Sequence, residues 1–151
     1  LVFKGICSGG YRLQEISERV NKCFGEKKCE AYTTMPDTPN SVSRRLMHEL
    51  IRLNLDCRQP VMLGYSKPSE LGHALVAVAY RREAWNRLRL FCLDPSHGVP
   101  FMHPWNTIID LDYRSSGDDD FTDTNYWTEK KVCVNDFLVV VDLPAETSSP
   151  F

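Results

Sequence analysis

The chain has 151 residues, of which 42% are hydrophobic, and this is enough for one compact domain over residues 1–151 that buries about two-thirds of its unfolded surface. Its 18 basic and 20 acidic residues are well mixed and give a net charge of −2, so nucleic acid is not an expected partner. No apolar stretch approaches the roughly 20 residues of a membrane-spanning helix, so the domain is expected to be soluble and to lack a membrane span.

Two helices are predicted in the first part of the chain. Residues 11–24 place apolar side chains at helical spacing, and Gly25 follows as a common C-terminal stop. Residues 29–40 carry two prolines among Thr, Asp and Asn, a composition that favours a loop. Residues 41–55 form the second predicted helix, with Ser41 as its N-cap. The leucines that share one face of this helix are Leu46, Leu50 and Leu53.

Strands follow the two helices. Residues 61–65 are typical of a short buried strand, and residues 73–80 are apolar almost throughout, so both faces of this strand should be covered. Residues 88–93 predict its antiparallel neighbour. Residues 105–112 predict a strand or turn, and residues 137–142 the last strand. We therefore predict an α+β fold in which N-terminal helices pack on a central antiparallel β-sheet.

Two chemically useful side chains stand at the ends of neighbouring predicted strands. With the connecting turn centred between Glu83 and Ala84, His73 lies directly opposite Asp94. Opposed residues have Cβ atoms about 4.5 to 5.5 Å apart, so the carboxylate could accept a hydrogen bond from the imidazole. Such a carboxylate orients a histidine that takes a proton from a nucleophile. The same pair can also be purely structural, and a register shift of one residue would separate the two side chains.

Three segments in this order and spacing resemble the papain-like cysteine peptidases, specifically the branch that includes the bacteriocin leader-processing (double-glycine) peptidases. Residues 60–65, 71–80 and 90–98 read Pro-Val-Met-Leu-Gly-Tyr, Leu-Gly-His-Ala-Leu-Val-Ala-Val-Ala-Tyr and Leu-Phe-Cys-Leu-Asp-Pro-Ser-His-Gly. The resemblance covers residues 41–98 and implies a papain-like fold. It also implies His73 as general base and Asp94 as the residue that orients it.

The nucleophile is expected to be a cysteine at the start of a helix, where the helix dipole and the histidine lower its pKa. Cys7 is the only cysteine just before a predicted helix, although no glutamine precedes it for an oxyanion hole, which departs from the family. Because the chain opens at Leu1 without an initiator methionine, the nucleophile is expected either at Cys7 or in a segment upstream of Leu1. The cysteines expected to act as packing residues are Cys23, Cys57, Cys92 and Cys133.

No cofactor or metal is expected, because no cysteine pair has Cys-x-x-Cys spacing and the four histidines do not stand at zinc-finger intervals. The scattered cysteines favour reduced thiols over disulfides. His97 and His103 follow Asp94 in a predicted loop, where they are expected to be exposed to solvent or to line a substrate cleft.

The first functional hypothesis is a cysteine protease or related thiol hydrolase, in which a thiolate attacks an amide of a protein or peptide and water releases the acyl-enzyme. Two alternatives stay open. In a transglutaminase-like acyl transferase an amine resolves the acyl-enzyme, whereas a non-catalytic papain-like module or fragment lacks the nucleophile and at most binds a partner. The cytoplasm, or by analogy a host cell that receives a bacterial effector, is the expected setting. The residues do not predict the oligomeric state.

Overall fold

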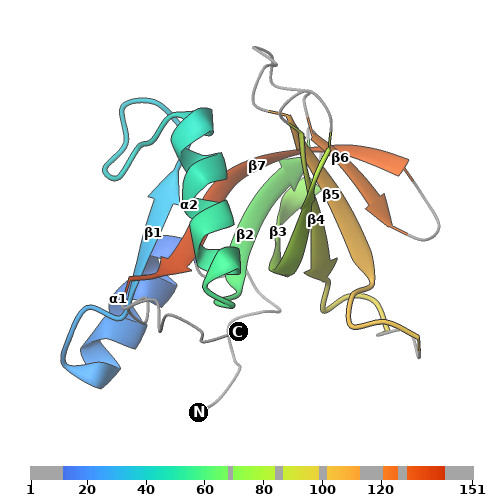
Figure 1. Cartoon of the computed structure of the whole chain (residues 1–151). Helices are drawn as coiled ribbons and strands as arrows, with labels where there is room; N and C mark the ends of the chain where they lie inside the picture. Colours follow the sequence, from blue (N-terminus) through green and yellow to red (C-terminus); the bar gives the residue numbers. More distant parts are fainter. Residues whose placement is uncertain are drawn as a thin grey trace.

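The computed structural model of the chain describes residues 12–67, 70–83, 87–98, 102–112, 121–125 and 129–141 (Figure 1). The elements in chain order are α1 (Leu13–Phe24), β1 (Cys29–Thr33), α2 (Arg44–Asp56), β2 (Val61–Lys67), β3 (Glu70–Arg82), β4 (Arg87–Leu93), β5 (Thr107–Asp112), β6 (Phe121–Asn125) and β7 (Glu129–Val140). Two helices and one antiparallel sheet confirm the predicted α+β class. Within the described residues, neither helix is long and apolar enough to span a membrane.

The strands form one sheet that closes on itself. Their order is β1-β7-β2-β3-β4-β5-β6, and β6 also pairs with β7. Strand β7 makes this closure possible because its first part pairs with β6 and its middle pairs with β2, while its last part also pairs with the edge strand β1. Figure 1 shows β7 as a long arched strand that reaches from β1 to β6. The closed part of the sheet therefore has an inward face that is shielded from solvent.

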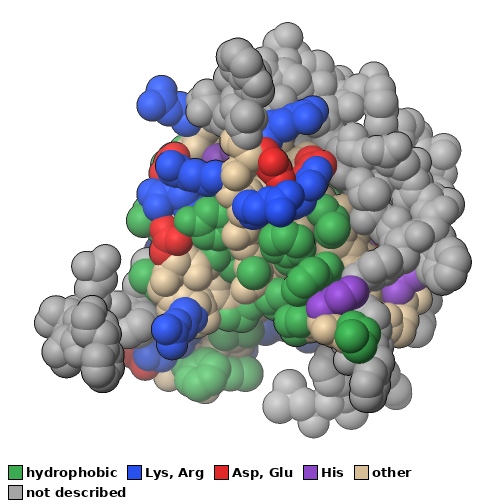
Figure 2. Space-filling view, turned by 45° about the vertical axis from the view of Figure 1, so that its right-hand side comes forward, with side chains coloured by type: hydrophobic (Ala, Val, Ile, Leu, Met, Phe, Trp, Pro, Cys, Tyr) green, Lys and Arg blue, Asp and Glu red, His purple; other side chains and the backbone are tan. Residues whose placement is uncertain are grey.

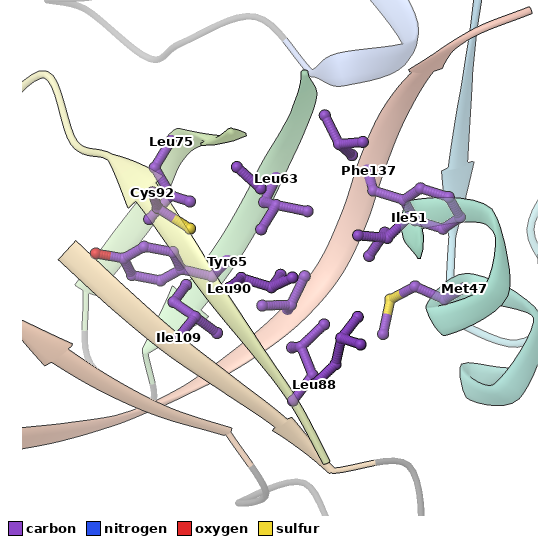
Figure 3. Close-up of a cluster of buried hydrophobic side chains, with 14 of the residues drawn as sticks. Met47, Ile51, Leu63, Tyr65, Leu75, Leu88, Leu90, Cys92, Ile109 and Phe137 are labelled. Carbon is purple, nitrogen blue, oxygen red and sulfur yellow. The ribbon is translucent and has the colours of Figure 1, made fainter. Parts of the chain in front are cut away.

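The hydrophobic core lies between this inward face and one side of α2. Figure 3 shows Met47 and Ile51 of α2 directed toward the side chains of the sheet, and both are fully buried. The strand residues of the core are Val61, Leu63, Tyr65, Leu75, Ala77, Leu88, Leu90, Cys92, Ile109, Leu111, Val132, Val134, Phe137 and Val139. Burial of these apolar side chains is the main favourable contribution to folding.

The buried face of α2 differs from the predicted one. Leu46 and Leu53 are exposed, whereas Met47, Ile51 and Leu55 form the buried stripe. Both stripes repeat at intervals of three or four residues, so periodicity alone allows either. Which of the two stripes contacts the sheet depends on the orientation of the helix on the sheet. That orientation is set by contacts between residues far apart in the sequence.

Helix α2 also begins later than predicted, because its N-cap is Ser43 and not Ser41. The Ser43 hydroxyl accepts a hydrogen bond from the Leu46 amide at 3.2 Å. Ser41 instead forms an isolated bridge with Thr33. The side chain of Ser43 thus satisfies one of the amides that a helix start leaves without an intrahelical partner.

Removing this cap should weaken the fold measurably. We expect Ser43→Ala to lower the free energy of unfolding by about 1 kcal/mol, because the Leu46 amide loses its acceptor. Urea unfolding followed by far-UV circular dichroism measures the change. Ser43→Asp, which keeps an acceptor, and Ser41→Ala should both stay within about 0.5 kcal/mol of the wild type. An equal loss in Ser41→Ala would contradict the assignment of the cap.

Helix α1 packs on the opposite, outward face of the sheet. Gly64 alternates with core residues of β2 and so faces outward, and a Cβ placed on it would lie 3.6 Å from Leu13 Cδ1 and 3.3 Å from Asp136 Cβ. A side chain here would therefore press on Asp136 of β7, whereas its distance to Leu13 of α1 would be an ordinary van der Waals contact. As predicted, α1 ends at Gly25, whose φ of 70° lies in the left-handed region.

Strand β1 corrects the prediction of a loop over residues 29–40. Cys29 and Ala31 are buried and alternate with less buried neighbours, as expected for a strand. The two prolines that favoured a loop stand after the strand, so the predicted loop began too early in the chain.

Candidate active site

His73 and Asp94 are in direct contact. His73 Nε2 lies 2.8 Å from Asp94 Oδ1, so the predicted contact is present. The Asp94 side chain is 3% exposed and the His73 side chain 29% exposed. On the face drawn in Figure 2, histidine side chains reach the surface beside hydrophobic ones. The pair thus combines a shielded carboxylate with an imidazole that a reactant can approach.

The predicted register of the β3–β4 hairpin was wrong. Near the turn, Arg82 pairs with Leu88, and the pairing shifts by one residue at an irregularity between Ala77 and Ala79. On the side of this β-bulge away from the turn, the ladder ends with the pair Val76 and Leu93.

The β-bulge determines whether His73 and Asp94 can make their contact. Continued past Val76, the register places Asp94 opposite Leu75, so His73 is its diagonal neighbour on the same face of the sheet. Without the bulge Asp94 would face Val76, and His73 would point to the other side because side chains alternate along a strand. One extra residue in β3 therefore directs the imidazole toward the carboxylate.

The surroundings of Asp94 keep its carboxylate ionised. Burial raises the pKa of Asp94, but hydrogen bonds from the Ser96 amide at 2.7 Å and from His73, with the charges of His73 and His97, outweigh it and hold the pKa below its usual value. His97 Nδ1 lies 3.1 Å from Asp94 Oδ2. The sequence did not predict this second imidazole on the carboxylate.

An Asp94 pKa that is lowered by folding gives a defined pH dependence of stability. The ionised carboxylate favours the folded state above the unfolded-state pKa of about 3.9, and this contribution is lost as the pH falls through the lower folded-state pKa. We expect the difference in unfolding free energy between wild type and Asp94→Asn to be largest above about pH 5 and to narrow toward about pH 3. Urea unfolding at several pH values measures it, and a difference that is constant with pH would contradict the expectation.

The hydrogen bond also fixes which nitrogen of His73 is available for chemistry. An ionised carboxylate only accepts hydrogen bonds, so Nε2 carries the proton and donates to Asp94. In the neutral ring Nδ1 is then the acceptor. In the serine protease triad the two nitrogens have exchanged roles, since the aspartate there holds Nδ1. A nucleophile activated by His73 must therefore approach Nδ1.

Tyr65 limits the motion of the His73 ring. The two residues are direct partners in the β2–β3 ladder, and their ring centroids are 5.3 Å apart at an interplanar angle of 65°. Tyr65 is buried, so its ring forms a fixed wall on one side of the imidazole. The ring of His103 instead stacks on the ring of Trp105, and their centroids are 4.5 Å apart.

Cys7 lies outside the described residues. Helix α1 begins at Leu13 with Arg12 as its N-cap, slightly later than the predicted start at residue 11. Among the described cysteines, Cys23, Cys29, Cys57 and Cys92 form no disulfide with one another.

None of these four described cysteines offers a thiol suited to the site. Cys92 shares the inward face with Asp94 but is fully buried in the core, so a substrate cannot reach it. Cys29 is buried between α1 and β1, where its sulfur lies within 4 Å of Ser17 and Asn21. Cys23 lies in the last turn of the outward-packed helix α1, and Cys57 caps the end of α2. The described part of the chain thus holds an imidazole–carboxylate pair but no accessible cysteine thiol beside it.

Comparison of the chain with known protein families, with curated proteins and with solved structures finds no match. Among the described residues, no group of three or more histidine, cysteine, aspartate or glutamate side chains is arranged to hold a metal ion. The contact between His73 and Asp94 is thus the feature of the described residues that bears most directly on function.

Proposed function

We propose that the chain is a cysteine protease or related thiol hydrolase with a papain-like fold, in which His73 is the general base and Asp94 orients it. The observation that supports this most directly is the 2.8 Å contact between a buried, ionised carboxylate and a partly exposed imidazole. This combination fixes the tautomer of the ring and stabilises the imidazolium that forms during proton transfer. The substrate would be an amide of a protein or peptide.

The proposed reaction proceeds in two halves. His73 Nδ1 accepts the proton of a cysteine thiol, and the thiolate adds to the amide carbonyl carbon. The imidazolium then gives its proton to the departing amine as the carbon–nitrogen bond breaks, which leaves a thioester. In the second half, His73 takes a proton from water as the water oxygen attacks the thioester carbon. The carbon–sulfur bond then breaks to release the carboxylic acid product, and the imidazolium returns its proton to the thiolate. Asp94 stays ionised throughout and balances the charge of the imidazolium.

Cys7 is the proposed nucleophile within the chain. The four described cysteines are buried or stand at helix ends, so they do not compete with it for this role. A nucleophile upstream of Leu1 is the alternative, and in that case the chain alone would bind a substrate without cleaving it.

A peptide library digested with the protein tests the proposed function. New peptide termini, read by mass spectrometry, should form with the wild type and disappear with His73→Ala. Asp110→Asn is a suitable control, because it changes a half-buried side chain of the neighbouring strand β5 that pairs with Arg89 and not with His73. An added alkyl amine such as cadaverine, at a concentration far below that of water, distinguishes the acyl transferase, whose products would carry the amine in place of water. Cleavage that persists in His73→Ala would exclude the proposed base.

A further inference from the structure

The ladder between β4 and β5 ends just before Asp94, and the side chain of Asn106 continues it. The last paired residues are Cys92 and Thr107, and the Asn106 amide still donates to the Cys92 carbonyl at 3.0 Å. Beyond this point Asn106 Oδ1 accepts from the Asp94 amide at 2.7 Å, and Asn106 Nδ2 donates to the Asp94 carbonyl at 2.9 Å. One side-chain amide thus meets both backbone polar groups of Asp94, as a neighbouring antiparallel strand would.

The same side chain holds the far end of the turn that follows Asp94. Asn106 Nδ2 also donates to the His97 carbonyl at 2.9 Å, while the His97 amide donates to the Asp94 carbonyl at 3.2 Å and closes the turn. Within this turn the Ser96 amide donates to Asp94 Oδ1. Asn106 therefore fixes both ends of the short segment that presents the carboxylate to His73.

Asparagine is suited to this place by its hydrogen-bonding groups. Asn106 is 2% exposed, so each of its polar atoms needs a partner inside the protein, and the three bonds supply them. Its orientation follows from the backbone, since Oδ1 faces an amide and Nδ2 faces carbonyls. An aspartate would turn an acceptor toward two carbonyl oxygens, and an alanine would remove the acceptor of the Asp94 amide and one donor from each of the two carbonyls.

From this geometry we propose that Asn106 is a positioning residue of the candidate active site. It fixes the direction of the Asp94 carboxylate and through it the Nε2–H tautomer of His73, so that Nδ1 stays available as the proton acceptor. Its importance for catalysis rests on the proposed function, whereas its effect on the His73 tautomer does not.

Nitrogen NMR of histidine-labelled protein tests the proposal, with His73→Gln used to assign the His73 signals. At about pH 8, where an ordinary imidazole is neutral, wild-type His73 should be the Nε2–H tautomer. In Asn106→Ala and Asn106→Asp, the signals should move to the tautomer mixture of a solvated imidazole. Asn54→Ala is the matched control: Asn54 is 3% exposed and also joins backbone groups, at Leu50 and Val140, but makes no bond to the segment of Asp94.

An unchanged His73 tautomer in a folded Asn106 variant would overturn the proposal. So would rapid hydrogen exchange of the Asp94 amide in the wild type, a measurement that needs no variant and stands even if both substitutions prevent folding. In the hydrolysis assay, Asn106→Asp should lower kcat by about 10²-fold with little change in KM, as expected when a catalytic group is misplaced. If the wild type cleaves no peptide but the NMR result holds, the proposed function fails and the positioning role of Asn106 stands.

Discussion

Replacing Asp94 with alanine should lower the hydrolysis rate by about 10³-fold, within the range that a positioned general base contributes. Alanine leaves the Nε2–H of His73 without its acceptor, so the ring is no longer held with Nδ1 toward the thiol. The imidazolium also loses the negative charge that balances it. The kcat of the best peptide from the library digestion measures the loss.

The matched control for this change is Asp110→Ala, because Asp110 lies on β5 and forms a paired hydrogen bond with Arg89. It should change kcat by less than about tenfold. Far-UV circular dichroism of both variants shows whether either one is unfolded. An Asp94→Ala protein that is folded and hydrolyses within tenfold of the wild type would mean that Asp94 does not orient the catalytic base.

The largest effect on stability is expected at Phe137. This side chain is fully buried where β7 lies between β1 and β2, and its ring stacks on Tyr32 with centroids 5.3 Å apart. Figure 3 shows it facing Ile51 of α2. We expect Phe137→Ala to lower the free energy of unfolding by about 3 to 5 kcal/mol, because it leaves a cavity where the helix, β1 and the closed sheet meet. Urea unfolding with fluorescence detection measures the change.

Phe24→Ala provides the matched comparison, since it makes the same chemical change at a side chain that is 67% exposed. It should alter the free energy of unfolding by no more than about 0.5 kcal/mol. If Phe137→Ala cost less than about 1 kcal/mol, the packing of α2 and β1 on β7 described above would be incorrect.

The contact between His73 and Asp94 can be predicted from the sequence, but the strand register that produces this contact cannot. Two strands of strong apolar character, joined by a short connection, identify the hairpin that carries both residues. The β-bulge between Ala77 and Ala79 has no local signal, because the residues around it are small or β-branched and fit a regular strand equally well. The predicted register was therefore wrong, and the contact arises across a diagonal.

Features that depend on distant parts of the chain were not predictable. The closure of the sheet requires β7 to pair with β2, about 70 residues earlier, as well as with β6, and no local pattern encodes such a pairing. Asn106 was missed for a similar reason, since its partners are backbone atoms of the Asp94 turn. Its position at the start of a predicted strand, close to an Asp-Pro turn, is the one signal that could have indicated it.

The measurement that tests the proposed activation of a cysteine most directly is the alkylation of each cysteine by iodoacetamide in the folded protein, from about pH 4 to about pH 9, with the sites read by peptide mass spectrometry. We predict that Cys7 reacts with an inflection below about pH 7, and that His73→Ala moves this inflection to the range of an ordinary thiol near about pH 8.5. If every cysteine titrates as an ordinary thiol and His73→Ala changes none of them, His73 and Asp94 activate no thiol in this chain.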